Sequence, residues 1–262
     1  MSLQDEVILH TLRIISTKDN KTIERIGGGC LVLYRDIPFL LTVAHLRNTK
    51  ESKITLVLHN LPELSLLPNW YNINPTFLRR GRTRFPFWLE KIITRISNNH
   101  TDDIMNKHIK NLGKIDFAVS AVNLPFVPIF SLPINSGYVG CKYHAFDYSQ
   151  IVEPSKQKKY AFYGLTHFRY ENNQPLCDEV YLEDLEYIKT DSVYHIFKIS
   201  KKINNLKGCS GSPILDQEGN LVSIVVRKSK FWNNYIYGIN LKAVTIAFQI
   251  EANQITGVER YE

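Results

Sequence analysis

The stretch Gly208-Cys209-Ser210-Gly211-Ser212-Pro213 constrains this 262-residue chain more than any other. Its two glycines permit backbone dihedral angles that a β-carbon would forbid, and its proline ends the turn before an apolar run begins. Ser210 is therefore predicted to project its hydroxyl from a tight turn beside backbone N–H groups, as an acyl-transfer nucleophile requires. Because Gly-Ser-Gly runs also form ordinary turns, this prediction depends on a base and an acid elsewhere in the chain.

A histidine and an aspartate stand at the ends of two other apolar runs. His45 follows the run 39–44, and a short helical turn is expected to begin there. Asp116 opens the apolar run 117–122. Burying an unpaired carboxylate is costly, so Asp116 needs a partner, and a histidine is a natural one.

Short apolar runs separated by turns predict a β-rich chain. The glycines 27–29 precede such a run and lack the lysine of a phosphate loop, so they indicate close backbone approach instead. The stretch 62–112 is rich in Pro, Asn, Arg and aromatic residues, and we interpret it as an insertion with one amphipathic helix. A helix is also predicted over 243–253. The expected strands lie within 6–16, 26–34, 39–46, 54–58, 115–122, 138–146, 159–165, 176–188, 193–200, 213–215, 220–226 and 235–241.

Three motifs occur in the order His45, Asp116, Ser210. Thr42-Val43-Ala44-His45, Asp116-Phe117-Ala118-Val119 and the serine stretch together resemble the trypsin-like (chymotrypsin-fold) serine peptidases, as a bacterial-type stand-alone protease domain. The resemblance covers most of residues 20–250 except the insertion. It implies a mainly all-β chain with two six-stranded antiparallel β-barrels of the chymotrypsin type. The first would span 1–124 with the helical insertion, and the second 125–262 with a C-terminal helix.

The resemblance also implies a serine endopeptidase that works through an acyl-enzyme intermediate. Ser210 would attack the scissile carbonyl, His45 would move the proton, and Asp116 would hold the imidazole tautomer. The N–H groups of Gly208 and Ser210 would form the oxyanion hole, with the N–H of Cys209 between them. No cofactor is expected.

Cys209 departs from the acidic residue that secreted digestive members carry at this position, so activation through an ion pair with a freed N-terminus is not expected. A cysteine raises a rival nucleophile, but the position before the second glycine, which places a nucleophile beside both N–H donors, belongs to Ser210. Cys209 is then interpreted as a small buried hydrophobic residue.

The substrate pocket is expected near five residues, and none of them supplies an acidic floor that would favour Lys or Arg substrates. A medium apolar or polar side chain is one expected preference, and an acidic side chain recognised by the basic residues 227 and 228 is the other. The five candidates are Asn204, Val225, Val226, Arg227 and Gly238.

A catalytically silent binding module is the alternative function, with the arginines of the insertion engaging a protein or a nucleic acid. A single basic run is more typical of a solvated loop, so a nucleic-acid partner has no further support. A protein or peptide substrate and a regulatory partner protein are the expected partners. A metal site is not expected, because His100, Asp102, Asp103 and His108 lack the spacing of metal ligands.

The composition also predicts the cellular compartment of the protein. The four cysteines are scattered without a C-x-x-C pair, which is typical of reduced thiols. The polar N-terminus lacks an apolar signal core, and no uncharged run reaches the length of a membrane span. The sequence therefore predicts a cytoplasmic protein without a membrane span, whose formal charge of +7 is moderate.

Overall fold

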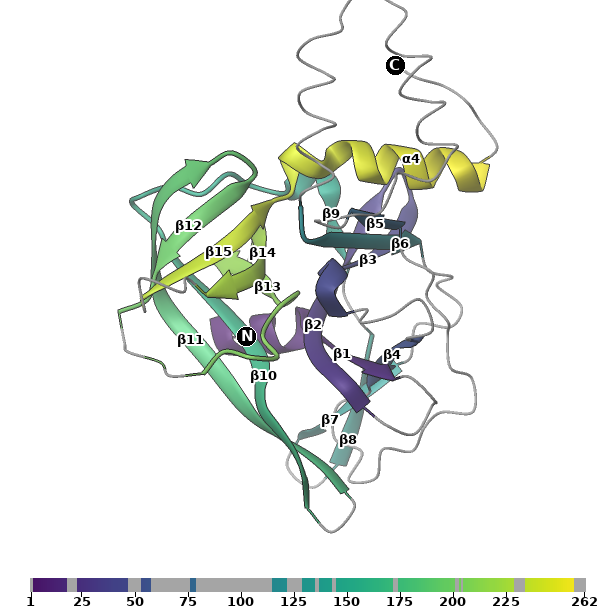
Figure 1. The fold of residues 1–262 in the computed structure, drawn as a ribbon, viewed down its shortest axis with the longest axis vertical. Helices are drawn as coiled ribbons and strands as arrows, with labels where there is room; N and C mark the ends of the chain where they lie inside the picture. Colours follow the sequence, from purple (N-terminus) through teal and green to yellow (C-terminus); the bar gives the residue numbers. More distant parts are fainter. Residues whose placement is uncertain are drawn as a thin grey trace, which may run out of the picture.

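The computed structural model describes residues 2–17, 23–46, 53–57, 76–78, 115–121, 129–134, 137–142, 145–171, 174–200, 203, 205–228 and 234–256. The C-terminal half forms a closed antiparallel barrel in the strand order β10-β11-β12-β15-β14-β13 (Figure 1). Its strands are β10 (Lys159–Glu171), β11 (Gln174–Asp191), β12 (Tyr194–Lys198), β13 (Pro213–Asp216), β14 (Leu221–Lys228) and β15 (Tyr235–Asn240).

The N-terminal half forms a second sheet in the order β4-β1-β2-β3-β6-β5. The short strand β9 (Phe146–Asp147) pairs with β2 in parallel, and β7 (Ile129–Ile134) pairs with β8 (Gly137–Lys142). This architecture confirms the predicted mainly all-β fold of the two-barrel chymotrypsin type. Besides β9, the described strands of this sheet are β1 (Leu12–Thr17), β2 (Ile23–Tyr34), β3 (Ile37–Thr42), β4 (Lys53–Val57), β5 (Thr76–Leu78) and β6 (Phe117–Ala121).

Alternating side chains of the C-terminal barrel contribute to two cores, because successive residues of a strand point to opposite faces. Ile214 and Val225 pack with the aromatic residues inside the barrel. Leu215, Ile224 and Val226 instead join the core that the barrel shares with the N-terminal sheet. The second core joins the two halves along the strands that flank the predicted nucleophile.

The first strand was expected to begin at residue 6, and this prediction is wrong. Residues 3–10 form helix α1 (Leu3–His10), and β1 begins at Leu12. Ser2 and Asp5 form a capping box, with the N–H of Asp5 donating to Ser2 Oγ at 3.2 Å. This local cap, together with burial of Val7 against the barrel, outweighs the β propensity of the apolar residues.

The predicted C-terminal helix is confirmed as α4 (Thr245–Thr256), which follows the short 3₁₀ helix η4 (Lys242–Val244). In Figure 1, α4 lies across the N-terminal sheet, close to β3 and β6. The ring of Phe248 lies 5.6 Å from those of Tyr34 and Phe39, and 5.1 Å from that of Tyr148. The helix thus anchors the C-terminal end of the chain to the N-terminal half. The helix predicted within the insertion 62–112 lies outside the described residues.

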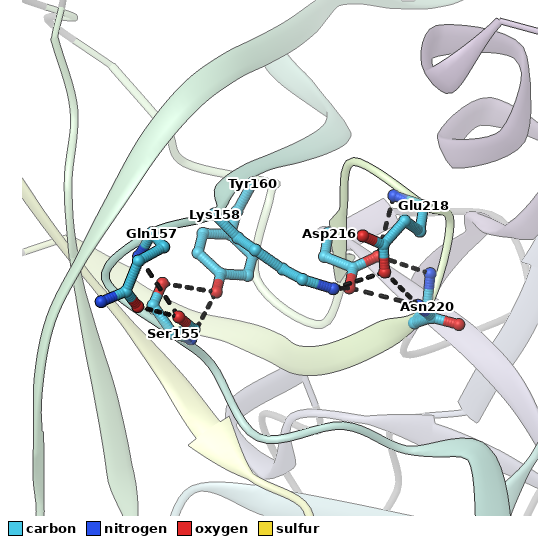
Figure 2. Close-up of polar contacts among 7 residues, drawn as sticks. All are labelled: Ser155, Gln157, Lys158, Tyr160, Asp216, Glu218 and Asn220. Atoms are coloured by element: carbon cyan, nitrogen blue, oxygen red, sulfur yellow. Dashed lines mark hydrogen bonds and ion pairs between the residues drawn. The ribbon is translucent and has the colours of Figure 1, made fainter.

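The β13–β14 hairpin turn is held by the buried carboxylate of Asp216 (Figure 2). Its Oδ1 accepts the backbone N–H groups of Glu218 at 3.0 Å and Asn220 at 2.9 Å. Its Oδ2 accepts from Lys158 Nζ at 2.9 Å. Burial alone would raise the pKa of Asp216, but these donors together hold it below its usual value. These contacts hold the turn between β13, which directly follows the serine stretch, and β14, which pairs with it.

Candidate active site

His45 and Asp116 meet because their strands are neighbours. Strand β3 ends at Thr42, which pairs with Ala118 near the start of β6, so the residues just beyond these ends lie side by side. The predicted helical turn is η1 (Ala44–Leu46). Asp116 Oδ2 lies 2.5 Å from His45 Nδ1, and Asp116 Oδ1 accepts the backbone N–H of His45 at 2.8 Å. The predicted partnership of these two residues is present in the structure.

The serine turn is held between the two halves of the molecule by backbone hydrogen bonds. The N–H of Gly28, on β2, donates to the carbonyl of Ser210 at 2.8 Å. On the other side, the N–H of Gly211 donates to the carbonyl of Val225 at 2.6 Å, and the N–H of Val225 donates to the carbonyl of Ser212 at 2.8 Å. Both ends of the turn are thus fixed by strands that are far apart in the sequence.

Two glycines make this approach sterically feasible. A Cβ on Gly28 would lie 2.3 Å from Ser212 Oγ and 2.7 Å from Ser212 N. A Cβ on Gly211, whose φ is +93°, would lie 2.0 Å from the Gly28 carbonyl oxygen. The sequence indicated close backbone approach at 27–29, and the structure shows that the partner is the serine turn itself.

The hydroxyl of Ser210 donates to the carbonyl oxygen of Val226 at 2.9 Å. The register of β14 and β15 shifts between Val225 and Arg227, so Val226 is the extra residue of a β-bulge. Within the described part of the chain, Ser210 makes no hydrogen bond to His45. The geometry therefore has a formed His–Asp pair and a serine whose proton is directed to a backbone acceptor.

Two backbone N–H groups of the turn are available to an oxyanion. Among the residues that the structure describes, the N–H groups of Gly208 and Ser210 have no hydrogen-bond acceptor. Gly208 has a φ of +103°, which favours glycine. The N–H of Cys209 instead donates to the carbonyl of Leu206 at 3.2 Å. The turn itself thus uses the N–H of Cys209, and the oxyanion hole of residues 208–210 stays a prediction.

The thiol of Cys209 is fully buried, as predicted for a small hydrophobic residue. It lies against Gly164 of β10, where a Cβ would come within 2.9 Å of Sγ, and it contacts the carbonyl of Leu165 at 3.6 Å. Burial raises the pKa of the Cys209 thiol to about 12, so the sulfur stays protonated at neutral pH. A protonated, enclosed thiol is a poor nucleophile, whereas the hydroxyl of Ser210 is only partly buried.

The pocket candidates do not come together at one surface. Val225 and Val226 are buried in the two cores, and Arg227 is exposed. Gly238 lies inside the barrel, where a Cβ would be 2.7 Å from Ser223 Oγ, and β14 separates it from the serine turn. Asn204 lies outside the described residues. A role of these residues in substrate binding stays a prediction.

Three backbone groups that sequence reasoning missed also shape the site: the carbonyls of Leu206 and Val226, and the N–H of Gly28. Backbone groups leave no residue-type signal, so only the glycine stretch within β2 pointed to one of them. Arg25 is a further missed contributor, because its Nη1 donates to the carbonyl of His45 at 2.6 Å and holds η1.

No family model and no curated protein matches the chain. Among solved structures, it is similar to a thermostable serine protease from an extremophilic microorganism, with a TM-score of 0.51 and 11% identity over 94% of this chain and 97% of that one. It is also similar to the tobacco vein mottling virus protease, with a TM-score of 0.45 and 10% identity over 92% and 80%. A serine endoprotease from Yersinia pestis gives 0.47 and 13% over 96% and 66%.

The first of these likenesses, together with the strand order, shows that the chain has the fold of the chymotrypsin-type serine proteases. Among the described helices, none is long and apolar enough to span a membrane. Within the same residues, no group of three or more His, Cys, Asp or Glu side chains is placed to hold a metal ion.

Proposed function

We propose that this protein is a trypsin-like serine endopeptidase that cleaves peptide bonds through Ser210, His45 and Asp116. The observation that carries the proposal is the two-point contact of Asp116 with His45, at 2.5 Å to Nδ1 and 2.8 Å to the backbone N–H. In the proposed mechanism, this pair acts on the serine turn, which backbone hydrogen bonds hold between the two halves of the molecule.

The imidazole is oriented for base catalysis. Because His45 Nδ1 donates its proton to Asp116, Nε2 carries the lone pair and can accept a proton. Asp116 then stabilises the imidazolium that forms. His45 returns the proton to the leaving amine, and water repeats the sequence to release the acyl group from Ser210.

Ser210 must first leave its acceptor. Rotation about its Cα–Cβ bond breaks the hydrogen bond to the Val226 carbonyl and directs the hydroxyl elsewhere. A hydrogen bond of this kind contributes about 1 kcal/mol, so the rotation lowers the rate only modestly. As the tetrahedral intermediate forms, its oxyanion would be stabilised by the N–H groups of Gly208 and Ser210, each of which is worth about a hundredfold in rate.

A catalytically silent binding module is the second candidate, and one observation favours it: the Ser210 hydroxyl is bonded to Val226 rather than to His45. In that case the protein would bind a peptide or a regulatory partner without cleaving it. The two candidates differ in one property, the nucleophilicity of Ser210.

A fluorophosphonate probe tests this property directly. Wild-type protein is expected to be labelled, Ser210→Ala to be unlabelled, and His45→Ala to be labelled at least about a hundredfold more slowly, because the general base is lost. Ser212→Ala is the matched control: it removes from the same turn a buried hydroxyl that has no hydrogen-bond partner in the described part of the chain, and it is expected to keep the labelling. Folded wild-type protein that resists the probe would support the binding module instead.

A further inference from the structure

Strand β14 changes its partner beside Ser210. As far as Ile224, it pairs with β13 on one side. At Val225 and Val226, the serine turn takes the place of β13 through the hydrogen bonds described above. Among the described residues, no strand pairs with Arg227 and Lys228 on this side. The last residues of β14 therefore offer backbone groups to an extended peptide that reaches Ser210, a common mode of peptide recognition.

The side chain of Arg227 is exposed and extends from β14 over tyrosine rings of the strands on its paired side, β15 and β12. Its guanidinium carbon lies 5.0 Å from the ring centroid of Tyr237 and 5.8 Å from that of Tyr194. The two rings contact each other edge-on at 6.3 Å. An arginine that stacks on aromatic rings keeps the N–H groups along its edge free for bidentate hydrogen bonds.

Arg227 has no anionic partner in the part of the chain that the structure describes, although the side chain is exposed and oriented. Its neighbour Lys228 differs, because Nζ of Lys228 donates to the carbonyl of Ile203. Arg227 is thus a preorganised cation, one residue beyond the backbone acceptor of the nucleophile.

We propose that Arg227 recognises a carboxylate side chain of the substrate, within about four residues of the scissile bond. The inference rests on the proposed endopeptidase function. An extended peptide advances about 3.3 Å per residue. A substrate side chain roughly two to four residues from the scissile bond therefore comes within reach of an arginine adjacent to Val226. The planar guanidinium matches a carboxylate in a bidentate fashion, which a lysine would not. The substrate class is therefore an acidic peptide.

Binding to Ser210→Ala protein tests the proposal without requiring chemistry. A set of fluorescent peptides with Gln at every position is compared, by anisotropy, with versions that carry Glu at one position at a time. We expect Glu at one or two neighbouring positions to tighten binding about tenfold, and 0.5 M salt to weaken this preference. In the Ser210→Ala protein, the further change Arg227→Gln is expected to remove the difference between Glu and Gln peptides.

Arg35→Gln is the matched control, because Arg35 is also exposed and also lies over a tyrosine ring, that of Tyr34 at 5.5 Å, on the β2–β3 turn. It is expected to keep the Glu preference. Equal affinity for Glu and Gln peptides, absence of peptide binding, or a preference that survives Arg227→Gln overturns the role of Arg227. Fluorophosphonate labelling of the wild type reports separately on the endopeptidase function, so the two failures are distinguishable.

Discussion

At the residue scale, burial decides which side chains can carry charge. The carboxylate of Asp116 is partly exposed and makes two contacts with His45, whereas the Cys209 thiol one residue before Ser210 is enclosed and neutral. The carboxylate thus reaches a polar partner, whereas the thiol, which lies in the other half of the molecule, is shielded from solvent. The separation arises from the environment and not from the residue types alone, because a cysteine in an open, electropositive site would be reactive.

His195 is a second case in which burial controls charge. It is 1% exposed, on β12. Ser223 Oγ donates to the carbonyl of Ile239, so it accepts from His195 Nδ1 at 3.0 Å, and Nε2 carries the lone pair. The half-exposed carboxylate of Glu153 lies 3.3 Å from Nε2. Burial nevertheless lowers the pKa of His195 to about 4.

This lowered pKa predicts a loss of stability on mild acidification. Between about pH 6.5 and pH 4, the unfolded state binds a proton that the folded state refuses, so the free energy of unfolding falls as the pH falls. From pH 7.5 to pH 5, the contribution amounts to about 2 kcal/mol. Urea unfolding of wild type and His195→Gln at both pH values measures it, and the stability advantage of the wild type is expected to shrink by this amount.

His167→Gln is the control for that measurement, because His167 is half exposed on the same barrel. Its unfolding free energy is expected to follow that of the wild type between the two pH values. A His195→Gln protein whose stability difference from the wild type does not vary with pH would contradict the prediction.

At the scale of elements, the site depends on a close contact between β2 and the serine turn. Gly28 on β2 and Gly211 in the turn approach so closely that neither tolerates a Cβ. The contact aligns the turn with η1, where His45 lies at the end of the neighbouring strand β3. The position of Ser210 relative to His45 is therefore set by strand packing, since within the described residues the turn makes no hydrogen bond to His45.

Gly28→Ala tests this dependence. The new Cβ would overlap Ser212 Oγ and N, so the turn must shift, and a misplacement of about 1 Å costs roughly a hundredfold in rate. Fluorophosphonate labelling is expected to slow by about that factor while the circular dichroism spectrum stays that of the wild type.

Gly219→Ala provides the comparison for Gly28→Ala. Gly219 has a φ of +84°, but a Cβ there meets nothing closer than 3.9 Å. It is expected to lose about 1 kcal/mol of stability from backbone strain and to keep its labelling rate. Equal labelling of the two variants would show that the β2 contact does not position Ser210.

At the scale of the whole molecule, the helix near each end of the chain packs on the half formed by the other end. Helix α1 packs on β10 and β13 of the C-terminal barrel, and α4 packs on β6 of the N-terminal sheet. A polar contact joins the halves as well, with Nη2 of Arg13 donating to the Tyr163 hydroxyl at 2.6 Å. The domain boundary predicted at residue 124 stays a prediction. Because both helices and the Arg13–Tyr163 contact join the two halves, we expect the halves to unfold together.

The docked helix α4 carries a buried carboxyl. Glu251 is 8% exposed, and its Oε1 has no hydrogen-bond partner among the described residues. Burial raises the pKa of Glu251 to about 7. Above this pH, the folded protein must bury a charge that the unfolded chain keeps in water, so the group lowers stability as the pH rises from about 4.5 to 7.

Glu251→Gln is therefore expected to stabilise the protein relative to the wild type at high pH. The gain should grow by about 2 kcal/mol between pH 5 and pH 8.5, because the amide carries no charge to bury. Urea unfolding at both pH values measures the gain. Glu186→Gln, at an exposed carboxylate paired with Lys159, should show no comparable growth. A constant difference for Glu251→Gln would exclude a buried, titrating carboxyl on α4.

Most of the strands and the order of the site residues could be predicted from the sequence, because both leave a local signal. Alternating and continuous apolar runs mark the strands around His45, Asp116 and Ser210. Helix α1 was missed because its signal is one capping box ahead of β-branched residues. The hydrogen bond from the Cys209 N–H to the Leu206 carbonyl could not be predicted, because the direction of an N–H within a turn depends on φ and ψ, which residue type specifies only weakly.

The sequence alone determined that a serine, a histidine and an aspartate stand at the ends of separate β-strands, and that glycines must allow a close approach. Only the tertiary structure decided that β2 contacts the serine turn, that the Ser210 hydroxyl is bonded to Val226, and that Arg227 lies on two tyrosine rings. The physical reason is range: turn conformation and strand periodicity depend on neighbouring residues, whereas these contacts join segments that only the closing of the barrel brings together.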